Sequence, residues 1–144
     1  MSGWVISNAL ALVQLQATLA RLDASPGPAT LLLYTTPLPP DGDAPAIAPD
    51  PQVTIPLASP SGSIVAGVLK LTQAPSASPM AAASGIPRWG LLVAGDGVPL
   101  ARGDVTDNAH TGAIRITGGP TAGGDTSPSL YAGGLVSLSE TFLT

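Results

Sequence analysis

Residues 88–105, RWGLLVAGDGVPLARGDV, carry the clearest fold signal in the chain. Two largely apolar runs, 88–93 and 98–105, flank the tetrapeptide Ala94-Gly95-Asp96-Gly97. Because Asp and Gly accept the positive φ angles that tight turns require, this stretch predicts a β-hairpin. Trp89 lies on the more apolar side of the first run, which predicts a tryptophan in the core.

Short segments with a two-residue apolar period continue on both sides of the hairpin. Residues 52–58 alternate cleanly, with Val53 and Ile55 on the apolar side, and Pro56 predicts that this strand lies at a sheet edge. Further strands are predicted at residues 30–34, 64–72, 113–117 and 135–143, and an extended proline-rich loop at 37–51. Many short strands without alternating strand–helix units predict an all-β chain, folded as an antiparallel sandwich or barrel.

The N-terminal region has a helical period instead. Four leucines, Leu12, Leu15, Leu19 and Leu22, recur at helical spacing and therefore share one face of an α-helix. Ser7 or Asn8 can cap the first turn, and the prolines at 26 and 28 end the helix. We expect the leucine face to pack on the chain's own sheet; a seam for a partner helix is the alternative.

The chain is thus predicted to consist of an N-terminal arm and helix, residues 1–28, and a β domain, residues 29–144. A length of 144 residues fits one structural unit overall. Trp4, Val5 and Ile6 precede the helix, where they can staple it or present an apolar anchor to a neighbour.

Charge is sparse and acidic. The chain has 5 Lys and Arg against 9 Asp and Glu, a formal charge of −4, and charged residues make up 10% of it. Scattered basic residues argue against nucleic acid and against anionic membranes, since both need clustered Lys and Arg. Segment 3–20 is uncharged but contains Ser, Asn, Gln and Thr, so it predicts neither a membrane span nor a signal peptide. We expect another chain to cover part of so poorly charged a surface.

No group of residues has the spacing of a catalytic or metal site. Cys is absent, His110 is the single histidine, and Glu140 has no acidic neighbour. Three aspartates, Asp96, Asp104 and Asp107, leave a shared calcium ion open, although they lack the alternating pattern of a calcium loop. Glycine-rich segment 118–124 lacks the Lys of a phosphate-binding loop. We therefore expect no enzymatic activity and no cofactor.

Several short motifs occur in a fixed order along the chain. They are Leu33-Tyr34-Thr35, Val53–Leu57, Arg88–Val93 followed by Gly95-Asp96-Gly97, Gly103-Asp104-Val105, and the closing segment Tyr131–Thr144. In this order the chain resembles a family of small tailed-bacteriophage virion proteins, and the resemblance covers residues from about 9 to 144. The chain departs from that pattern in its long proline loop, residues 37–51, and in an insert at 118–124.

The resemblance implies a jelly-roll-like antiparallel β-sandwich with one N-terminal α-helix, and a role as a capsid decoration (cement) protein. Such a protein binds the outside of an assembled capsid and holds capsomers together without catalysis. The implied partners are the major capsid protein and further copies of the chain, in a homodimer or another homo-oligomer. The implied location is the capsid surface of the virion, after synthesis in the cytoplasm of the host bacterium. A tail or neck component, or a carbohydrate-binding module on the particle surface, is the alternative.

Interface residues are predicted from apolar anchors and from strand pairing. An aromatic residue beside aliphatic neighbours makes a good anchor, and an edge strand can pair with a symmetry mate. The predicted interface set is Trp4, Val5, Ile6, Leu12, Leu15, Leu19, Val53 and Ile55.

Overall fold

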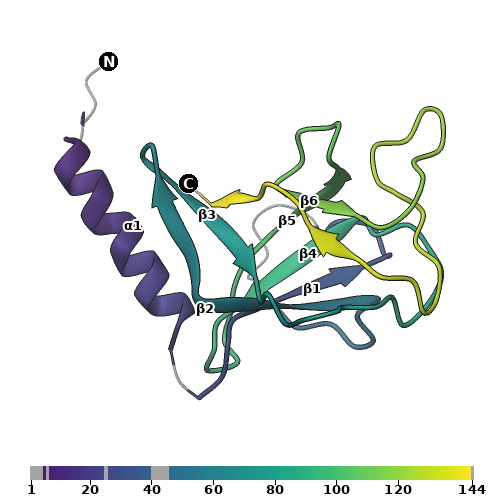
Figure 1. The fold of residues 1–144 in the computed structure, drawn as a ribbon, viewed down its shortest axis with the longest axis horizontal. Coiled ribbons are helices and arrows are strands. Elements are labelled where there is room, and N and C mark those ends of the chain that lie inside the picture. The colour runs from purple at the N-terminus through teal and green to yellow at the C-terminus, as the bar shows by residue number, and fades with distance from the viewer. Residues whose placement is uncertain (1–4, 6, 25, 40–45, 144) are drawn as a thin grey trace.

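The computed structural model describes residues 5, 7–24, 26–39 and 46–143. Within these residues it contains one helix, α1 (Asn8–Leu22), followed by eight strands. The strands are β1 (Thr30–Tyr34), β2 (Val53–Val65), β3 (Val68–Gln73), β4 (Trp89–Val93), β5 (Pro99–Asp107), β6 (Ile114–Thr117), β7 (Ser137–Leu138) and β8 (Phe142–Leu143). The chain is mostly β with one N-terminal helix, as the sequence predicted (Figure 1).

α1 begins and ends where its capping chemistry predicts. The Ser7 hydroxyl accepts a hydrogen bond from the Leu10 N–H at 3.2 Å, and the Asp23 N–H donates to the Leu19 carbonyl at 3.0 Å. Leu22 is fully buried, and Leu15 and Leu19 pack against the core with partial exposure. The leucine face therefore contacts the chain's own sheet, as predicted, in the C-terminal half of the helix.

The strands form one mixed sheet in the order β7-β6-β5-β4-β1-β2-β3-β8. All neighbours are antiparallel except β5 and β6, which run parallel. The sheet curls into a half-barrel (Figure 1), so the predicted sandwich of two stacked antiparallel sheets is not confirmed. The predicted hairpin of residues 88–105 is confirmed, since β4 pairs with β5 and the Ala94 N–H donates to the Val98 carbonyl at 2.9 Å.

β2 corrects two sequence predictions. It extends through residues 58–64, with a register shift in its pairing with β3 between Leu57 and Gly62. It turns into β3 at Ala66 and Gly67, inside a segment predicted to be a single strand. It also corrects the prediction of a sheet edge in part: β2 as a whole lies between β1 and β3, although its residues 53–56 pair with β1 alone. Pro56 is tolerated there because it precedes the first β2–β3 pair, Leu57 with Gln73, and its missing N–H breaks no pair of that ladder.

The C-terminal segment corrects a third prediction. Residues 135–143 were expected to form one strand, but β7 and β8 lie at opposite edges of the sheet. Residues 139–141 cross between these edges: the Ser139 N–H donates to the Arg115 carbonyl at 2.8 Å, and the Thr141 carbonyl accepts from Leu71 at 2.9 Å. The C-terminal segment thus bridges the opening of the half-barrel.

Each face of the curled sheet has its own apolar cluster. The larger cluster fills the inside of the curl, with fully buried side chains such as Leu31, Ile55 and Leu69. On the other face, Trp89 stacks on Tyr34 with ring centroids 4.4 Å apart and an interplanar angle of 19°. The Tyr34 hydroxyl donates to the Ala48 carbonyl at 2.8 Å, which ties the proline-rich loop over the pair. The prediction of a core tryptophan is confirmed, since Trp89 is buried.

Candidate interaction surface

The structure separates the predicted interface residues into three groups. Leu12 and Val5 are exposed, with 43% and 96% of their residue surface accessible to solvent, whereas Leu15 and Leu19 are half-buried against the core. Trp4 and Ile6 lie outside the described residues.

After the exposed and the half-buried residues, the third group is the buried pair Val53 and Ile55. Their prediction as interface residues needs correction. Both are buried in the core cluster, with 1% and 0% exposure. Both pair with β1 and point their side chains into the core cluster, so their apolar alternation reflects core packing.

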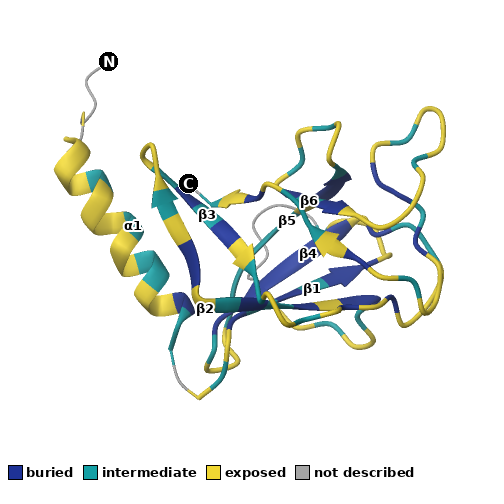
Figure 2. Ribbon diagram, viewed as in Figure 1, coloured by how far each residue is buried: buried dark blue, intermediate teal, exposed yellow. Residues whose placement is uncertain are grey.

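α1 projects from the body with its N-terminal half largely uncovered. Figure 2 shows exposed residues along most of the helix, and among the helical residues only Leu22 is classed as buried. Leu10 is 46% exposed and Val13 is 58% exposed, and together with Leu12 they place three exposed aliphatic residues on this half of the helix.

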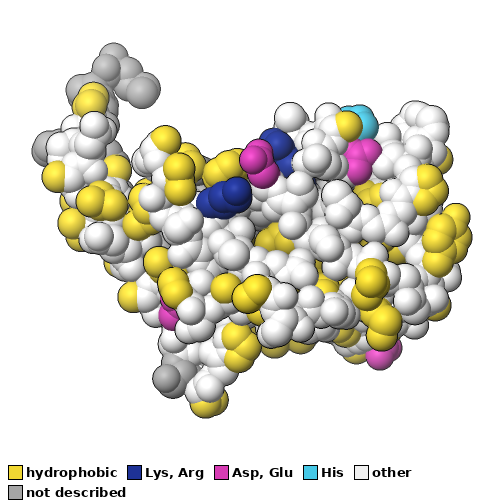
Figure 3. Space-filling model, in the orientation of Figure 1, with side chains coloured by type: hydrophobic (Ala, Val, Ile, Leu, Met, Phe, Trp, Pro, Cys, Tyr) yellow, Lys and Arg dark blue, Asp and Glu magenta, His cyan; other side chains and the backbone are white. Residues whose placement is uncertain are grey.

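A groove separates this half of α1 from the tip of the β2–β3 hairpin. It encloses about 360 Å³ and is lined by Asn8, Ala11, Leu12, Ile64, Ala66 and Gly67. Val65, at the same hairpin tip, is 52% exposed. Apolar side chains gather over the helix and this hairpin in Figure 3. We call Leu10, Leu12, Val13, Ile64 and Val65 the helix–hairpin surface.

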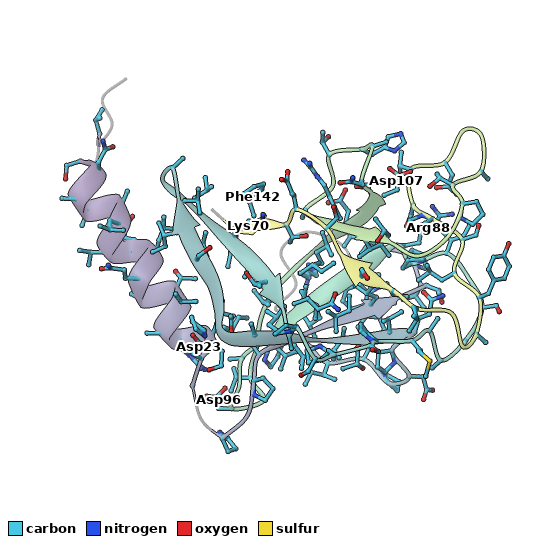
Figure 4. The ribbon with its side chains drawn as sticks, in the orientation of Figure 1. Asp23, Lys70, Arg88, Asp96, Asp107 and Phe142 are labelled. Carbon is cyan, nitrogen blue, oxygen red and sulfur yellow. The ribbon has the colours of Figure 1, made fainter. Side chains whose placement is uncertain are left out.

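Polar contacts at the foot of α1 hold the helix to the body. The Asp23 carboxylate accepts hydrogen bonds from the Ser61 hydroxyl and from the Ser61 N–H, the latter at 3.0 Å. Arg21 forms an ion pair with Asp96 at 3.0 Å, and the Gly95 N–H donates to the Leu22 carbonyl at 2.9 Å. Asp23 and Asp96 lie together below the helix in Figure 4. The helix is thus anchored at one end and projects at the other.

The three aspartates considered for calcium are engaged separately. Asp96 pairs with Arg21, and Asp104 accepts from the Ala113 N–H at 3.0 Å. Asp107 accepts from Thr121 and lies 2.6 Å from Nδ1 of His110. Among the residues that the structure describes, no group of three or more His, Cys, Asp or Glu is placed to hold a metal ion.

His110 belongs to a network that ties loops together. The Thr121 hydroxyl and His110 both bond the Asp107 carboxylate, and these bonds hold its pKa below the ordinary value. The Asp107 N–H also donates to the Thr126 carbonyl at 2.8 Å. Asp107 thus joins the end of β5 to the loop that contains the glycine-rich insert.

Arg88 and Asp125 hold the same loop from its other side. The guanidinium donates two hydrogen bonds to the carboxylate, at 2.8 and 3.1 Å, and lowers the pKa of Asp125 to about 2 with help from the Thr126 and Ser127 N–H groups. Arg88 and Asp107 lie at the end of the molecule farthest from α1 in Figure 4. These charged groups are occupied in holding loops in place.

Two further hollows lie in the half-barrel. An apolar cavity of about 60 Å³ lies between Leu31, Leu92 and Ile114, far below the size of a typical ligand site of about 300–1,000 Å³. A polar slot of about 500 Å³, lined in part by Lys70 and Glu140, follows the gap between β3 and residues 138–140. Gln73 spans this slot and accepts from the Leu138 N–H at 2.8 Å, so the slot is partly bridged by the chain itself.

Sequence reasoning found one wall of the groove and missed the other. The helical leucines mark Leu12, but Ile64, Ala66 and Gly67 were predicted to lie inside a strand. The dipeptide Ala66-Gly67 could have indicated a turn only weakly, because Asn-Gly and Asp-Gly are the strong hairpin signals.

Comparison with protein-family models, curated proteins and solved structures finds no match for this chain. Within the described residues, no helix combines the length and the apolar character needed to cross a membrane.

Proposed function

We propose that this chain is a non-catalytic structural protein of a tailed-bacteriophage virion, which binds the outside of the assembled capsid and cements neighbouring capsomers. The proposal joins the order of motifs along the sequence to the helix–hairpin surface. The observation that carries it is the exposure of Leu10, Leu12 and Val13 on a helix that projects from the body. Burying exposed aliphatic side chains releases about 25 cal/mol for each Å² removed from water, so this surface favours a protein partner.

The placement of the charged groups supports a structural role. Arg21, Arg88, Asp107 and Asp125 each form bonds that hold a helix or a loop to the body. A cement protein needs a rigid body and an apolar contact surface. It stabilises a shell because it binds the assembled form and not the free subunits, which shifts the equilibrium toward the intact particle.

We infer that the half-barrel is a variant of the jelly-roll-like sandwich that the motif order implies. β2 pairs with β1 along its first half and with β3 along its second half. This one bent strand therefore belongs to two walls of the half-barrel, one that contains β1 and one that contains β3. Leu31 and Ile55 on one wall and Leu69 and Leu71 on the other share one apolar cluster. Two walls facing across a common core are what a sandwich also provides.

Co-sedimentation with capsids tests the proposal. Capsids are purified from the phage that encodes the chain after deletion of its gene, and the full-length protein is added back. The wild-type protein and Gln14→Asp are expected to sediment with the shells, and Leu12→Asp to bind at least about tenfold more weakly, since it places a charge in the groove. Gln14 is exposed on the same helix outside the groove, so it controls for the added charge. Failure of the wild-type protein to bind would overturn the proposal.

Immunogold labelling of whole particles separates the head from the tail. Gold on the capsid supports the proposal, whereas gold confined to the neck or tail supports a tail or neck component and would contradict capsid cementing.

A carbohydrate-binding module receives less support from the side chains. Sugar binding of this kind needs several exposed coplanar aromatic rings, whereas Tyr34 and Trp89 stack on each other and are buried. Of the described aromatic residues, this leaves Tyr131 and Phe142, at 61% and 39% exposure. A glycan array with a specific hit would favour this alternative.

A further inference from the structure

The turn between β4 and β5, residues 94–97, is packed tightly against the foot of α1. The Gly95 N–H donates to the Leu22 carbonyl at 2.9 Å, and the Gly27 N–H donates to the Gly95 carbonyl at 3.0 Å. The two segments leave no free space between them, since a Cβ atom on Gly95 would lie 2.1 Å from the carbonyl oxygens of Ala24 and Gly27. A change in the length of the main chain in this turn would therefore displace the foot of α1.

Asp96 and Gly97 in this turn form a dipeptide that can change the length of its own main chain. The backbone nitrogen of Gly97 can attack Cγ of Asp96, because glycine has no Cβ atom to hinder the approach. A C–N bond forms, the bond from Cγ to the carboxyl hydroxyl breaks, and one water molecule leaves with the amide proton. Water then opens the cyclic imide. Its addition at Cγ restores aspartate, whereas its addition at the main-chain carbonyl gives isoaspartate, whose main chain is one atom longer.

The folded protein holds both reacting groups in other bonds. Oδ2 of Asp96 accepts a hydrogen bond from Arg21 at 3.0 Å, and Oδ1 accepts one from the Val98 N–H at 3.2 Å. The Gly97 N–H donates to the Ala94 carbonyl at 2.9 Å. Closure of the imide ring must break the bond of the Gly97 N–H and turn the carboxyl group away from Arg21. These bonds therefore oppose the reaction as long as α1 stays in place.

The charge of Asp96 opposes ring closure as well. The carboxyl group loses its oxygen far more easily when it is protonated, so the ionised form is the unreactive one. Desolvation raises the pKa of Asp96, but the hydrogen bonds from the Val98 N–H and from Arg21 outweigh it and leave the pKa below its ordinary value. The carboxyl group is therefore ionised at neutral pH while these bonds are formed.

We propose that Asp96 is a site of isoaspartate formation, which Arg21 protects while α1 is docked on the body. Arg21 lies in the last turn of α1, and Asp96 lies below the end of the helix (Figure 4), so a motion that lifts this end separates the pair. The two side chains are 43% and 32% exposed, and so exposed an ion pair adds little stability and opens readily. Isoaspartate lengthens a turn that has no space at Gly95. The modification thus makes a reversible opening of the foot of α1 permanent, whatever the helix–hairpin surface binds.

Incubation in water enriched in the heavy oxygen isotope measures the reaction, because each imide that is hydrolysed gains one heavy oxygen atom. Mass spectrometry of peptides follows the label at Asp96 and, in the same sample, at Asp41, which also precedes a glycine and lies outside the described residues. Asp96 of the wild-type protein is expected to gain label at least about tenfold more slowly in the folded protein than in urea, because the folded protein must first open locally. Equal rates at Asp96 in the two samples would overturn the proposed protection.

Two variants that each lose one positive charge test the role of Arg21. Arg21→Gln is expected to raise the rate of label uptake at Asp96 at least about threefold, which is the effect of losing an exposed ion pair, and to leave the rate at Asp41 unchanged. Arg115→Gln removes the same charge from β6 and is expected to match the wild-type protein at both aspartates. A rate at Asp96 that Arg21→Gln does not change would contradict the proposal.

Hydrogen exchange tests the consequence for α1. Aged wild-type protein is separated by ion-exchange chromatography into its aspartate and isoaspartate forms, which are identified by cleavage with an endoproteinase that cuts before aspartate only. The amides of α1 are expected to exchange at least about tenfold faster in the isoaspartate form, because the foot of the helix no longer docks, whereas those of β1 should exchange alike in both forms. Equal protection of α1 in the two forms would show that the modification does not release the helix.

Discussion

Ala66 explains why the turn between β2 and β3 was not predicted from the sequence. Ala66 and Gly67 have φ angles of 51° and 81°, and positive φ at both central residues is the type I′ conformation that two-residue hairpins favour. An alanine in the left-handed region costs about 1 kcal/mol, so Ala is a poor predictor of this turn. For this reason the sequence predicts one strand over residues 64–72 and no turn inside it.

Replacing Ala66 by Asn is expected to stabilise the protein by about 0.5–1 kcal/mol, because Asn tolerates the left-handed conformation better than Ala. Urea denaturation followed by fluorescence measures the free energy of unfolding. Ala109→Asn introduces the same side chain at another exposed loop residue, whose φ is not positive, and is expected to change little. A loss of stability in Ala66→Asn would show that the turn is not strained at Ala66.

Asp125 is expected to contribute a pH-dependent part of the stability. Its pKa in the folded protein is about 2, below its ordinary value of 3.8, chiefly because Arg88 donates hydrogen bonds to it. Between these two values the unfolded chain binds more protons at this group than the folded protein does. The contribution is thus complete above about pH 4 and is lost as the pH falls toward 2.

In Asp125→Asn, the free energy of unfolding should therefore fall less as the pH is lowered below about 4. Urea midpoints between pH 5 and about pH 2 are expected to fall more steeply in the wild-type protein than in Asp125→Asn. Parallel curves for the wild-type protein and Asp125→Asn would contradict this account.

At the scale of elements, α1 shows what the spacing of leucines can and cannot predict about a helix. Leucine spacing predicted the helix and its contact with the sheet, because a 3.6-residue period reports which side chains share a face. Periodicity does not report how far along the helix the sheet extends. Leu22 is buried and Leu12, on the same predicted face, is 43% exposed.

The same pair of leucines gives a quantitative prediction. Leu22→Ala is expected to destabilise the protein by about 2–4 kcal/mol, because it removes a fully buried side chain and leaves a cavity. Leu12→Ala should change the free energy of unfolding by less than about 0.5 kcal/mol, as most surface substitutions do. Thermal or urea unfolding compares the two variants. Similar losses in both would show that the whole helix is docked on the sheet.

The β2–β3 pair depends on a close approach of two backbones. A Cβ atom on Gly62 would lie 2.2 Å from the Lys70 carbonyl oxygen, whereas a Cβ on Gly123 would meet no atom within 4 Å. Gly62 lies between the predicted strands at residues 52–58 and 64–72. The sequence could not indicate its close contact with β3, because a close approach of two backbones has no hydropathy pattern.

Gly62→Ala is therefore expected to destabilise the protein by about 1–3 kcal/mol, because β2 and β3 must move apart. Gly123→Ala, the control, is expected to be neutral within about 0.5 kcal/mol. Urea midpoints measure both. A neutral Gly62→Ala would imply that β2 and β3 separate easily, and with them one wall of the groove.

At the scale of the whole molecule, the number and position of most strands could be predicted, but the shape of the sheet could not. Residues 30–34 form β1 as predicted, and the hairpin of residues 88–105 is β4 with β5. The parallel pairing of β5 with β6 and the placement of β7 and β8 at opposite edges depend on contacts between distant residues. Local patterns carry no information on such contacts, so the sequence could not distinguish a sandwich from a half-barrel.

The helix–hairpin surface, too, could be predicted only where it depends on the local sequence. Its helical wall is local and was predicted in part through Leu12, whereas the hairpin wall arises only when β2 and β3 fold together. Val53 and Ile55 were predicted as interface residues because an alternating strand with a proline resembles an edge strand that could pair with a symmetry mate. Instead, their strand pairs with β1 and their side chains are buried in the core cluster.

The central claim is that the chain adds stability to an assembled shell through the helix–hairpin surface. Its most direct test is the temperature at which purified capsids release their DNA, measured with no added protein, with the wild-type protein and with Leu12→Asp. We expect the wild-type protein to raise this temperature in proportion to its occupancy and Leu12→Asp to leave it unchanged, since only a bound ligand stabilises the assembled state. The same release temperature in all three samples would contradict the account.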